Sequence, residues 1–283
     1  MRISGIQLGY DDDETLDDRV ARVGDLVRTQ HAADLVVLPE LWPSTGFDYR
    51  RWGAAAQTLD GTVVSAMREA ARDIGAYLHM GSLIEATPEA LTRLESVDHD
   101  VTRLPAIPDG ERGLWNTSVL IDPAGEVIAS YRKIHRFGFG NGEPKLLEAG
   151  EDVVTASIEV DGRTVTLGLA TCYDLRFPEQ FRALLDAGAE VFVVPAAWPA
   201  PRVDHWSLLA RARAAEDFCA MVAVNTAGFH SRTQMGGHSV VLDASANVLA
   251  EAGPDETIIT ADLDIETIHT RRTSFPALGD RRL

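Results

Sequence analysis

The order of the predicted elements indicates an α/β protein built from mixed sheets. Runs of β-branched residues that are typical of buried strands alternate with helical patterns, and β-hairpins interrupt that alternation. The 283 residues are 45% hydrophobic, which is enough for a globular fold with a sizeable core. No short repeat, low-complexity segment or clear linker divides the chain, so we expect a single domain over residues 1–283.

The first half of the chain is expected to contain β-α-β units followed by a hairpin. Strands are predicted at 2–8, 34–38, 76–84, 115–121 and 126–131, and helices at 16–27 and 62–74. Residues 86–114 show little periodicity and contain Pro88, Pro105 and Pro108. We expect this stretch to be a long loop that serves as a lid, a contact arm or a mobile segment.

The second half combines the same kinds of element. Strand pairs are predicted at 152–160 with 163–170 and at 238–243 with 248–250, and further strands at 190–195, 220–225 and 257–263. Helices are predicted at 178–186 and at 204–218, where Asp204 can serve as the N-cap, and a short helix is expected from Asp264.

Composition excludes several classes of function. The formal net charge of −17 argues against a nucleic-acid partner, which requires a basic face. Cys172 and Cys219 are too few for a disulfide framework, and no paired Cys/His spacing is present, so we expect no metal. The first residues read as a strand rather than a signal peptide, and no apolar run approaches the ~20 residues of a membrane span. We therefore expect a cytoplasmic protein that does not bind membranes.

Cys172 is the first candidate for chemistry. It follows an apolar strand and precedes Phe177-Pro178, where a helical pattern begins. Ligands and catalytic groups gather at the carboxyl ends of strands in α/β sheets, and a helix N-terminus lowers a thiol pKa. Cys172 is therefore a candidate nucleophile. The alternative is an inert, buried cysteine that acts as a small hydrophobe.

Glu40 and Lys133 occupy places comparable to that of Cys172. Each follows the carboxyl end of a separately predicted strand. Thiol attack on a carbonyl carbon needs a carboxylate that moves the proton and a cation that stabilises the oxyanion. Taken singly, the lysine and the glutamate could be solvated residues at strand ends. If the three strands are neighbours, the three side chains converge on one site.

These three residues lie in separate sequence motifs. The motifs are Leu38-Pro39-Glu40, Tyr131-Arg132-Lys133-Ile134-His135 and residues 168–179, accompanied by Gly5-Ile6-Gln7, Trp115-Asn116-Thr117, residues 194–198, His205-Trp206 and residues 237–239. Together they resemble the nitrilase superfamily, the carbon–nitrogen hydrolases, over nearly the whole chain. The resemblance implies a four-layer α-β-β-α sandwich that assembles into homodimers or larger homo-oligomers. It also implies hydrolysis of amides, carbamoyl groups or nitriles through a thioester, with no metal or organic cofactor.

The resemblance assigns roles to individual residues. It implies that Cys172 is the nucleophile, Glu40 the general base and Lys133 the oxyanion stabiliser, assisted by the backbone N–H of Tyr173. Many members carry a second glutamate that orients the lysine. Glu143 fits that position better than Glu148 does.

Residues 172–179 resemble the branch that contains ω-amidase and deaminated-glutathione amidase, which act on small amides bearing a carboxylate. Arg176 could bind that carboxylate, or it could pair with a structural acid such as Glu179. Further candidates for the pocket are the side chains Trp42, Phe47, His135, Trp198 and Arg202, although the aromatic ones could equally belong to the core. The segment 86–114 is longer than its counterpart in that branch and could reshape access to the pocket.

The leading hypothesis is therefore a cysteine-dependent hydrolase of a small linear amide, ω-amidase-like, that releases ammonia. Within enzymes, the alternatives are an N-carbamoyl-amide hydrolase, a nitrilase and a Cys–His hydrolase that would use His205 or His238. A noncatalytic binding or scaffold protein on the same fold is the alternative from another class. Cys219, in an apolar run, is expected to be inert.

Overall fold

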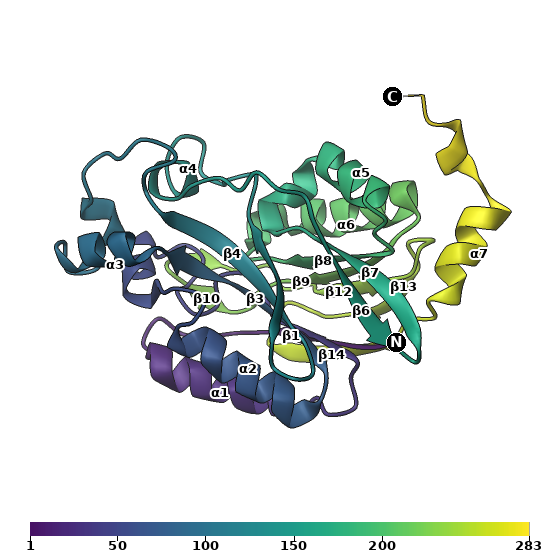
Figure 1. Cartoon of the computed structure of the whole chain (residues 1–283), viewed down its shortest axis with the longest axis horizontal. Coiled ribbons are helices and arrows are strands. Elements are labelled where there is room, and N and C mark those ends of the chain that lie inside the picture. Colours follow the sequence, from purple (N-terminus) through teal and green to yellow (C-terminus); the bar gives the residue numbers. More distant parts are fainter. Residues whose placement is uncertain (283) are drawn as a thin grey trace.

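Two six-stranded mixed sheets form the centre of the computed structural model, which describes residues 1–282 (Figure 1). The first sheet has the order β14 (Thr257–Asp262), β1 (Arg2–Gln7), β2 (Leu35–Val37), β3 (Tyr77–Ala86), β4 (Leu114–Ile121) and β5 (Val127–Arg132). The second has the order β13 (Val248–Glu251), β12 (Val240–Leu242), β9 (Ala220–Val224), β8 (Val191–Pro195), β7 (Arg163–Leu169) and β6 (Val154–Val160). A short ribbon pairs β10 (Phe229–His230) with β11 (Thr233–Gln234).

Helices cover the outer face of each sheet, which gives the four layers α-β-β-α (Figure 1). The helices α1 (Leu16–Arg28) and α2 (Thr62–Ile74) lie on the first sheet, and α5 (Pro178–Asp186) and α6 (Val203–Asp217) lie on the second. At one side of the sandwich, α7 (Glu266–Ser274) and the 3₁₀ turn η5 (Ala277–Asp280) lead to the C-terminus (Figure 1). The fold class and the sandwich expected from the sequence are thereby confirmed.

Side-chain alternation along the central strands explains their continuous apolar sequences. In β8, Val191 and Val193 pack into the core between the two sheets, whereas Phe192 and Val194 pack against the outer helices. In β2, Leu35 and Val37 enter the inter-sheet core. A strand that is buried on both faces needs apolar residues at every position, because successive side chains point to opposite faces.

The predicted hairpins are confirmed in register. The strands β6 and β7 pair from Val154 with Leu169 to Val160 with Arg163, so the turn lies at Asp161-Gly162. The strands β4 and β5 pair antiparallel, and so do β12 and β13.

Two predictions about local structure are wrong. Residues 86–114 are not an irregular loop, because they contain helix α3 (Pro88–Glu95) and the 3₁₀ turn η2 (Val101–Arg103). The Thr87 hydroxyl accepts a hydrogen bond from Ala90 N at 3.2 Å and caps α3. Pro88 therefore starts a helix rather than breaking one. The helix α6 begins at Val203 with Arg202 as its N-cap, and Asp204 lies in its first turn without serving as the cap.

Segment 86–114 packs onto the body of the protein rather than standing free of it. Ala90, Leu94 and Val101 join a buried cluster that contains Leu41 and Trp52. The Glu148 carboxylate accepts hydrogen bonds from the backbone N–H groups of Gly110 at 2.8 Å and Arg112 at 2.5 Å. This segment therefore supports the 3₁₀ helix η1 (Tyr49–Ala55), which carries Trp52.

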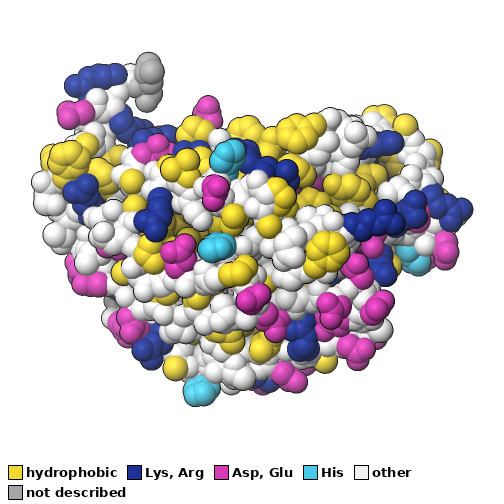
Figure 2. All heavy atoms as spheres, turned by 180° about the vertical axis from the view of Figure 1, so that it is seen from behind, with side chains coloured by type: hydrophobic (Ala, Val, Ile, Leu, Met, Phe, Trp, Pro, Cys, Tyr) yellow, Lys and Arg dark blue, Asp and Glu magenta, His cyan; other side chains and the backbone are white. Residues whose placement is uncertain are grey.

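Charge is distributed unevenly over the surface. In the face seen in Figure 2, Lys and Arg are most frequent over the upper half, among hydrophobic side chains, whereas Asp and Glu dominate the lower half. Within residues 1–282, no helix has both the length and the apolar character needed to cross a membrane.

Candidate active site

Three strand ends bring the predicted site residues together. The strands β2 and β3 are parallel, and β5 runs in the same direction because it follows two successive antiparallel pairings. Glu40 and Lys133 therefore leave the first sheet at the same end. Cys172 follows β7, and Ala197 follows the parallel neighbour β8. The two sheets meet here through a backbone hydrogen bond from Glu40 N to Ala196 O at 3.4 Å.

Gly81 makes room for the turn that carries Glu40. The β3 register shifts between His79 and Ser82, and Gly81 adopts a φ of 70°. An added Cβ at this position would overlap the Pro39 carbonyl oxygen. Glycine is therefore required both for its backbone conformation and for this close approach.

The Glu40 carboxylate is buried and bonded at both oxygens. Its Oε1 accepts hydrogen bonds from Lys133 Nζ at 2.7 Å and from Asn116 Nδ2 at 2.8 Å. Its Oε2 accepts one from the backbone N–H of Ala197 at 2.8 Å. These bonds fix the direction of the carboxylate, whose side chain is only 3% exposed.

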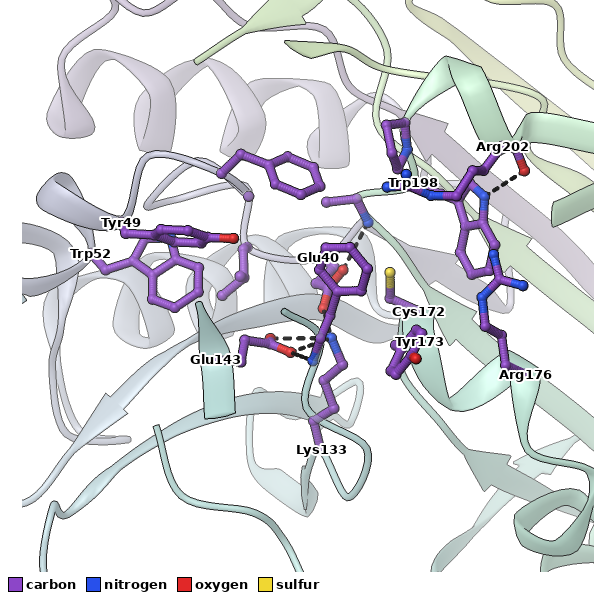
Figure 3. A pocket seen from close by; sticks show the side chains of 16 residues that line it. Glu40, Tyr49, Trp52, Lys133, Glu143, Cys172, Tyr173, Arg176, Trp198 and Arg202 are labelled. Atoms are coloured by element: carbon purple, nitrogen blue, oxygen red, sulfur yellow. Dashed lines mark hydrogen bonds and ion pairs between the residues drawn. The ribbon is translucent and has the colours of Figure 1, made fainter. Parts of the chain in front are cut away.

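Lys133 lies between two carboxylates. Its Nζ is 2.7 Å from Glu40 Oε1 and 3.0 Å from Glu143 Oε2 (Figure 3). Burial alone would lower the pKa of the Lys133 ammonium, but the charges of Glu143 and Glu40 together raise that pKa well above its usual value. Lys133 therefore carries a proton. Burial raises the pKa of Glu143, and the Lys133 charge opposes that effect.

Cys172 opens the 3₁₀ helix η3 (Cys172–Arg176) with a φ of 49°, a value uncommon for a residue other than glycine. The residue is 8% exposed and lines the same cavity as Glu40 and Lys133. Burial and then the nearby Glu40 charge raise the Cys172 pKa well above its usual value, while Lys133 opposes them. The expectation that the helix N-terminus gives this thiol a lowered pKa is therefore wrong, because burial and the Glu40 charge outweigh the effect of Lys133. The resting group is a neutral thiol beside a carboxylate.

The cavity that these residues line has walls of different character. Tyr49 and Trp52 lie on one side of Cys172, and Trp198, Arg176 and Arg202 lie on the other (Figure 3). The full lining is Glu40, Leu41, Gly46, Phe47, Tyr49, Trp52, Lys133, Phe137, Glu143, Cys172, Tyr173, Arg176, Ala197, Trp198, Pro199 and Arg202. Phe47, Tyr173, Trp198, Arg176 and Arg202 thus lie where the sequence hypothesis put them.

The guanidinium groups of both arginines in the cavity wall lie over aromatic rings. The guanidinium carbon of Arg176 is 4.7 Å from the Trp198 ring centroid, and that of Arg202 is 5.5 Å from the Phe137 centroid. Arg176 Nη1 is also 3.4 Å from His205 Nδ1. Within residues 1–282, neither arginine forms an ion pair with a carboxylate. The alternative that Arg176 pairs with Glu179 is therefore wrong.

Several candidate residues lie elsewhere. His135 is outside the cavity wall, with its ring stacked on Phe177 at a centroid distance of 3.7 Å. Trp42 is fully buried in the core beneath α1 and α2, where its Nε1 donates to Met80 O at 2.8 Å. Glu148 binds the segment 86–114 instead of Lys133. His205 and His238 do not line the cavity with Cys172, which removes the geometric basis for a Cys–His pair.

Asn116 is a site residue to which sequence reasoning gave no role. Its Nδ2 donates to Glu40 Oε1 at 2.8 Å and to Glu143 Oε1 at 2.7 Å, so one amide bridges both carboxylates. The backbone carbonyl of Asn116 also accepts from Lys133 N at 2.9 Å. The available signal is a polar amide in a strand that continues as the apolar run Val119-Leu120-Ile121, because a buried amide needs partners.

The site is a thiol beside a carboxylate and an ammonium in an α/β sandwich, which defines the class of cysteine hydrolases. The part of the chain that the structure describes holds no group of three or more His, Cys, Asp or Glu side chains arranged to bind a metal.

Comparison with known proteins identifies the family within this class. The family model for carbon-nitrogen hydrolase matches residues 3–273. A 2-oxoglutaramate amidase of Paenarthrobacter nicotinovorans is 40% identical over 280 residues, covering 99% of this chain and 89% of that protein. A 2-oxoglutaramate amidase of Bacillus subtilis is 33% identical over 250 residues, covering 88% of this chain and 85% of that protein.

A solved structure agrees with these relatives. The CN-hydrolase superfamily protein XC1258 of Xanthomonas campestris superimposes with a TM-score of 0.81 at 27% identity, covering 100% of this chain and 97% of that one. This chain belongs to the carbon–nitrogen hydrolase family.

Proposed function

We propose that this protein hydrolyses the C–N bond of a small linear amide through a covalent thioester on Cys172, releasing ammonia. The observation that carries the proposal is the contact of Glu40 Oε1 with Lys133 Nζ at 2.7 Å in the cavity that Cys172 lines. This contact supports the roles of Glu40 as proton acceptor and Lys133 as fixed positive charge beside Cys172 as nucleophile. Amide hydrolysis through a thioester uses all three functions.

Acylation begins from the neutral thiol. Glu40 takes the Cys172 proton as sulfur attacks the amide carbon, and the carbonyl electrons move onto oxygen. Lys133 stabilises that oxyanion, assisted by the backbone N–H of Tyr173, which has no intrahelical acceptor in the first turn of η3. Glu40 then returns the proton to the departing nitrogen, the C–N bond breaks, and ammonia leaves the thioester behind.

Deacylation uses the same groups in reverse order. Glu40 removes a proton from water, whose oxygen attacks the thioester carbon. The second oxyanion is again held by Lys133. Its collapse breaks the C–S bond, the thiolate regains the proton from Glu40, and a carboxylic acid is released. Glu143 keeps Lys133 charged and directed into the cavity, which its contact at 3.0 Å supports.

The proposed substrate is an amide that carries a carboxylate at its far end, ω-amidase-like. Arg176 lines the wall near Trp198 and Tyr173 with its guanidinium free of acid partners among residues 1–282. An arginine fork matches a carboxylate in geometry and charge. The two relatives named 2-oxoglutaramate amidase support a short ω-amide of a 2-oxo acid as the first substrate to test. Phe47 and Trp198 would pack against its methylene groups.

Ammonia release from a panel of compounds tests the activity. The panel contains small amides, N-carbamoyl amino acids and nitriles, and Cys172→Ala serves as the inactive control. Release from ω-amides alone is expected. Preference for carbamoyl compounds or nitriles would assign the corresponding hydrolase instead, and silence across the panel would point to a noncatalytic protein on this fold.

Two variants test the roles within that assay. Glu40→Gln is expected to fold and to fail at acylation, since the amide cannot accept the thiol proton; normal turnover would remove Glu40 from the base role. Arg176→Leu is expected to raise KM about 10- to 100-fold for an ω-amide with a carboxylate, because a bond to a charged group contributes roughly 1.5–3 kcal/mol. KM for the amide of equal length without the carboxylate is expected to stay unchanged.

We further propose that residues 1–283 fold as one domain, which the continuous core between the two sheets supports. The two free thiols support a reducing compartment such as the cytoplasm. A homodimer or larger homo-oligomer is proposed from the family resemblance, and light scattering on the purified protein measures it.

A further inference from the structure

A buried hydrogen-bond network connects the chain around Lys133 to the chain around Cys172. Its centre is Asp174, which is fully buried in η3, two residues after the thiol. Asp174 Oδ2 accepts from Thr171 N at 2.8 Å and from Tyr131 Oη at 2.6 Å. Asp174 Oδ1 accepts from His135 N at 3.0 Å and from His135 Nδ1 at 2.8 Å.

The proton positions in this network follow from its partners. The carboxylate of Asp174 only accepts, so Tyr131 must donate its one proton to it, and the His135 proton must lie on Nδ1. Tyr131 Oη then accepts from Ile134 N at 3.1 Å and from Gln180 Nε2 at 2.8 Å. Burial, followed by the Asp174 charge, raises the Tyr131 pKa well above its usual value, so the phenol keeps that proton.

The contacts of this network lie on both sides of Lys133 and on both sides of Cys172 in the sequence. Tyr131, Ile134 and His135 lie within two residues of Lys133 on either side, and all three are bonded within the network. Thr171 and Asp174 lie immediately before and after the Cys172-Tyr173 pair, whose first residue has the unusual φ of 49°. One carboxylate therefore joins the end of β5 in the first sheet to the turn after β7 in the second.

We propose that Asp174, with Tyr131 and His135, is a positioning device that sets the distance between the Lys133 ammonium and the Cys172 sulfur. It touches neither substrate nor thiol, since none of the three residues lines the cavity. Its effect is on the oxyanion site, which needs the ammonium and the Tyr173 N–H at fixed places relative to sulfur. The inference rests on the proposed hydrolysis at Cys172. Misplacement of a catalytic group by about 1 Å costs on the order of 100-fold in rate.

Tyr131→Phe removes the Asp174 bond while keeping the ring. We expect kcat to fall about 10- to 100-fold with KM little changed. The pH profile for alkylation of Cys172 by iodoacetamide, followed by intact mass, is expected to move to higher pH because Lys133 lowers the thiol pKa from its present place. The matched control is Tyr77→Phe, which removes a half-buried phenol oxygen that accepts from Glu159 N at 3.1 Å, away from the cavity. Its kcat and alkylation profile are expected to equal those of the wild type.

A second pair of variants changes His135, which is less buried than Tyr131. It separates the effect of the hydrogen bond to Asp174 from the effect of packing against Phe177. His135→Asn keeps a donor near Nδ1 but loses the stack on Phe177, whereas His135→Phe keeps the stack and loses the donor. We expect kcat and the alkylation profile to be largely retained in His135→Asn and impaired in His135→Phe. The reverse order, or a Tyr131→Phe profile that overlays the Tyr77→Phe profile, would overturn the inference. Alkylation needs no substrate, so it still tests the network if the protein hydrolyses none of the amides.

Discussion

Asn116→Asp offers the sharpest test of the carboxylate pair around Lys133. The substitution is nearly isosteric and replaces the Nδ2 donor by an oxygen. In the wild type that donor reaches Glu40 Oε1 at 2.8 Å and Glu143 Oε1 at 2.7 Å, in a residue only 2% exposed. The new carboxyl group must either ionise beside two other carboxylates or stay protonated. Repulsion between like charges favours the protonated form.

The expected loss follows from the number of bonds. Each hydrogen bond to a charged group contributes roughly 1.5–3 kcal/mol, and a protonated carboxyl group can donate only one. One of the two Asn116 bonds is therefore lost. If the whole free energy of the lost hydrogen bond is lost from the transition state because Glu40 is misaligned, we expect kcat to fall roughly 10- to 100-fold. About 1.4 kcal/mol corresponds to a tenfold change in rate.

The same variant should become sensitive to pH. The new carboxyl group is expected to have a folded pKa above its unfolded value of about 3.9. A raised folded pKa contributes stability that is fully present below the unfolded pKa and is lost as the pH rises through the folded pKa. The deficit in Tm relative to the wild type should therefore be smaller at pH 5 than at pH 8.

Turnover and thermal unfolding at several pH values measure both effects. Asn247→Asp is the matched control, because Asn247 Nδ2 also donates to a carboxylate, Asp243 Oδ2 at 2.9 Å, but on the exposed surface. Its change in stability is expected to stay within about 0.5 kcal/mol. Wild-type turnover in Asn116→Asp, together with a Tm deficit that does not vary with pH, would refute the proposed bridge.

Three further predictions concern other parts of the molecule. One equivalent of iodoacetamide should modify Cys172 and abolish turnover, because Cys172 lines the cavity beside the carboxylate of Glu40 whereas Cys219 is fully buried; peptide mass mapping that finds the label on Cys219 with activity retained would contradict this. Burial lowers the pKa of His79 to about 4, below the unfolded value of about 6.5, so the associated stability is present above pH ~6.5 and is lost as the pH falls toward ~4. His79→Leu should therefore reduce the acid-induced fall in Tm, by an amount equivalent to about 3 kcal/mol at pH ~4, whereas an unchanged pH profile would assign acid sensitivity elsewhere. Added salt should raise KM for a carboxylate-bearing amide and leave KM for a neutral amide unaffected, and equal salt dependence for both would count against a charged subsite.

The fold and the three central residues were accessible from the sequence because each depends on short stretches. A buried strand, a proline and then Glu40 can be recognised locally, and the parallel arrangement of strands brings such ends to one edge of a sheet. The expectation of a loop at residues 86–114 overlooks helix α3, because proline alone indicates irregular structure, although Thr87 before Pro88 is a favourable cap.

The partners of the central residues were less accessible because they depend on pairings between strands. Asn116 reaches Glu40 and Glu143 only once β4 lies beside β3 and β5. His135 lies two residues after Lys133, and the sequence gives no indication that its ring turns away from the cavity toward Asp174. The direction of the thiol pKa shift is equally hidden from the sequence, because the degree of burial around Cys172 is a property of the packed site.

The charges of the cavity explain how so acidic a chain could accept an anionic substrate. Its wall contains three cationic side chains, Lys133, Arg176 and Arg202, and two carboxylates, Glu40 and Glu143, which leaves one net positive charge when all are ionised. The chain as a whole carries −17. Because exposed charges are screened beyond roughly 8–10 Å at physiological ionic strength, the potential felt by a substrate at the cavity is set mainly by the wall. Both carboxylates favour the charged form of Lys133, and the two arginines supply the positive charge that reverses the local sign.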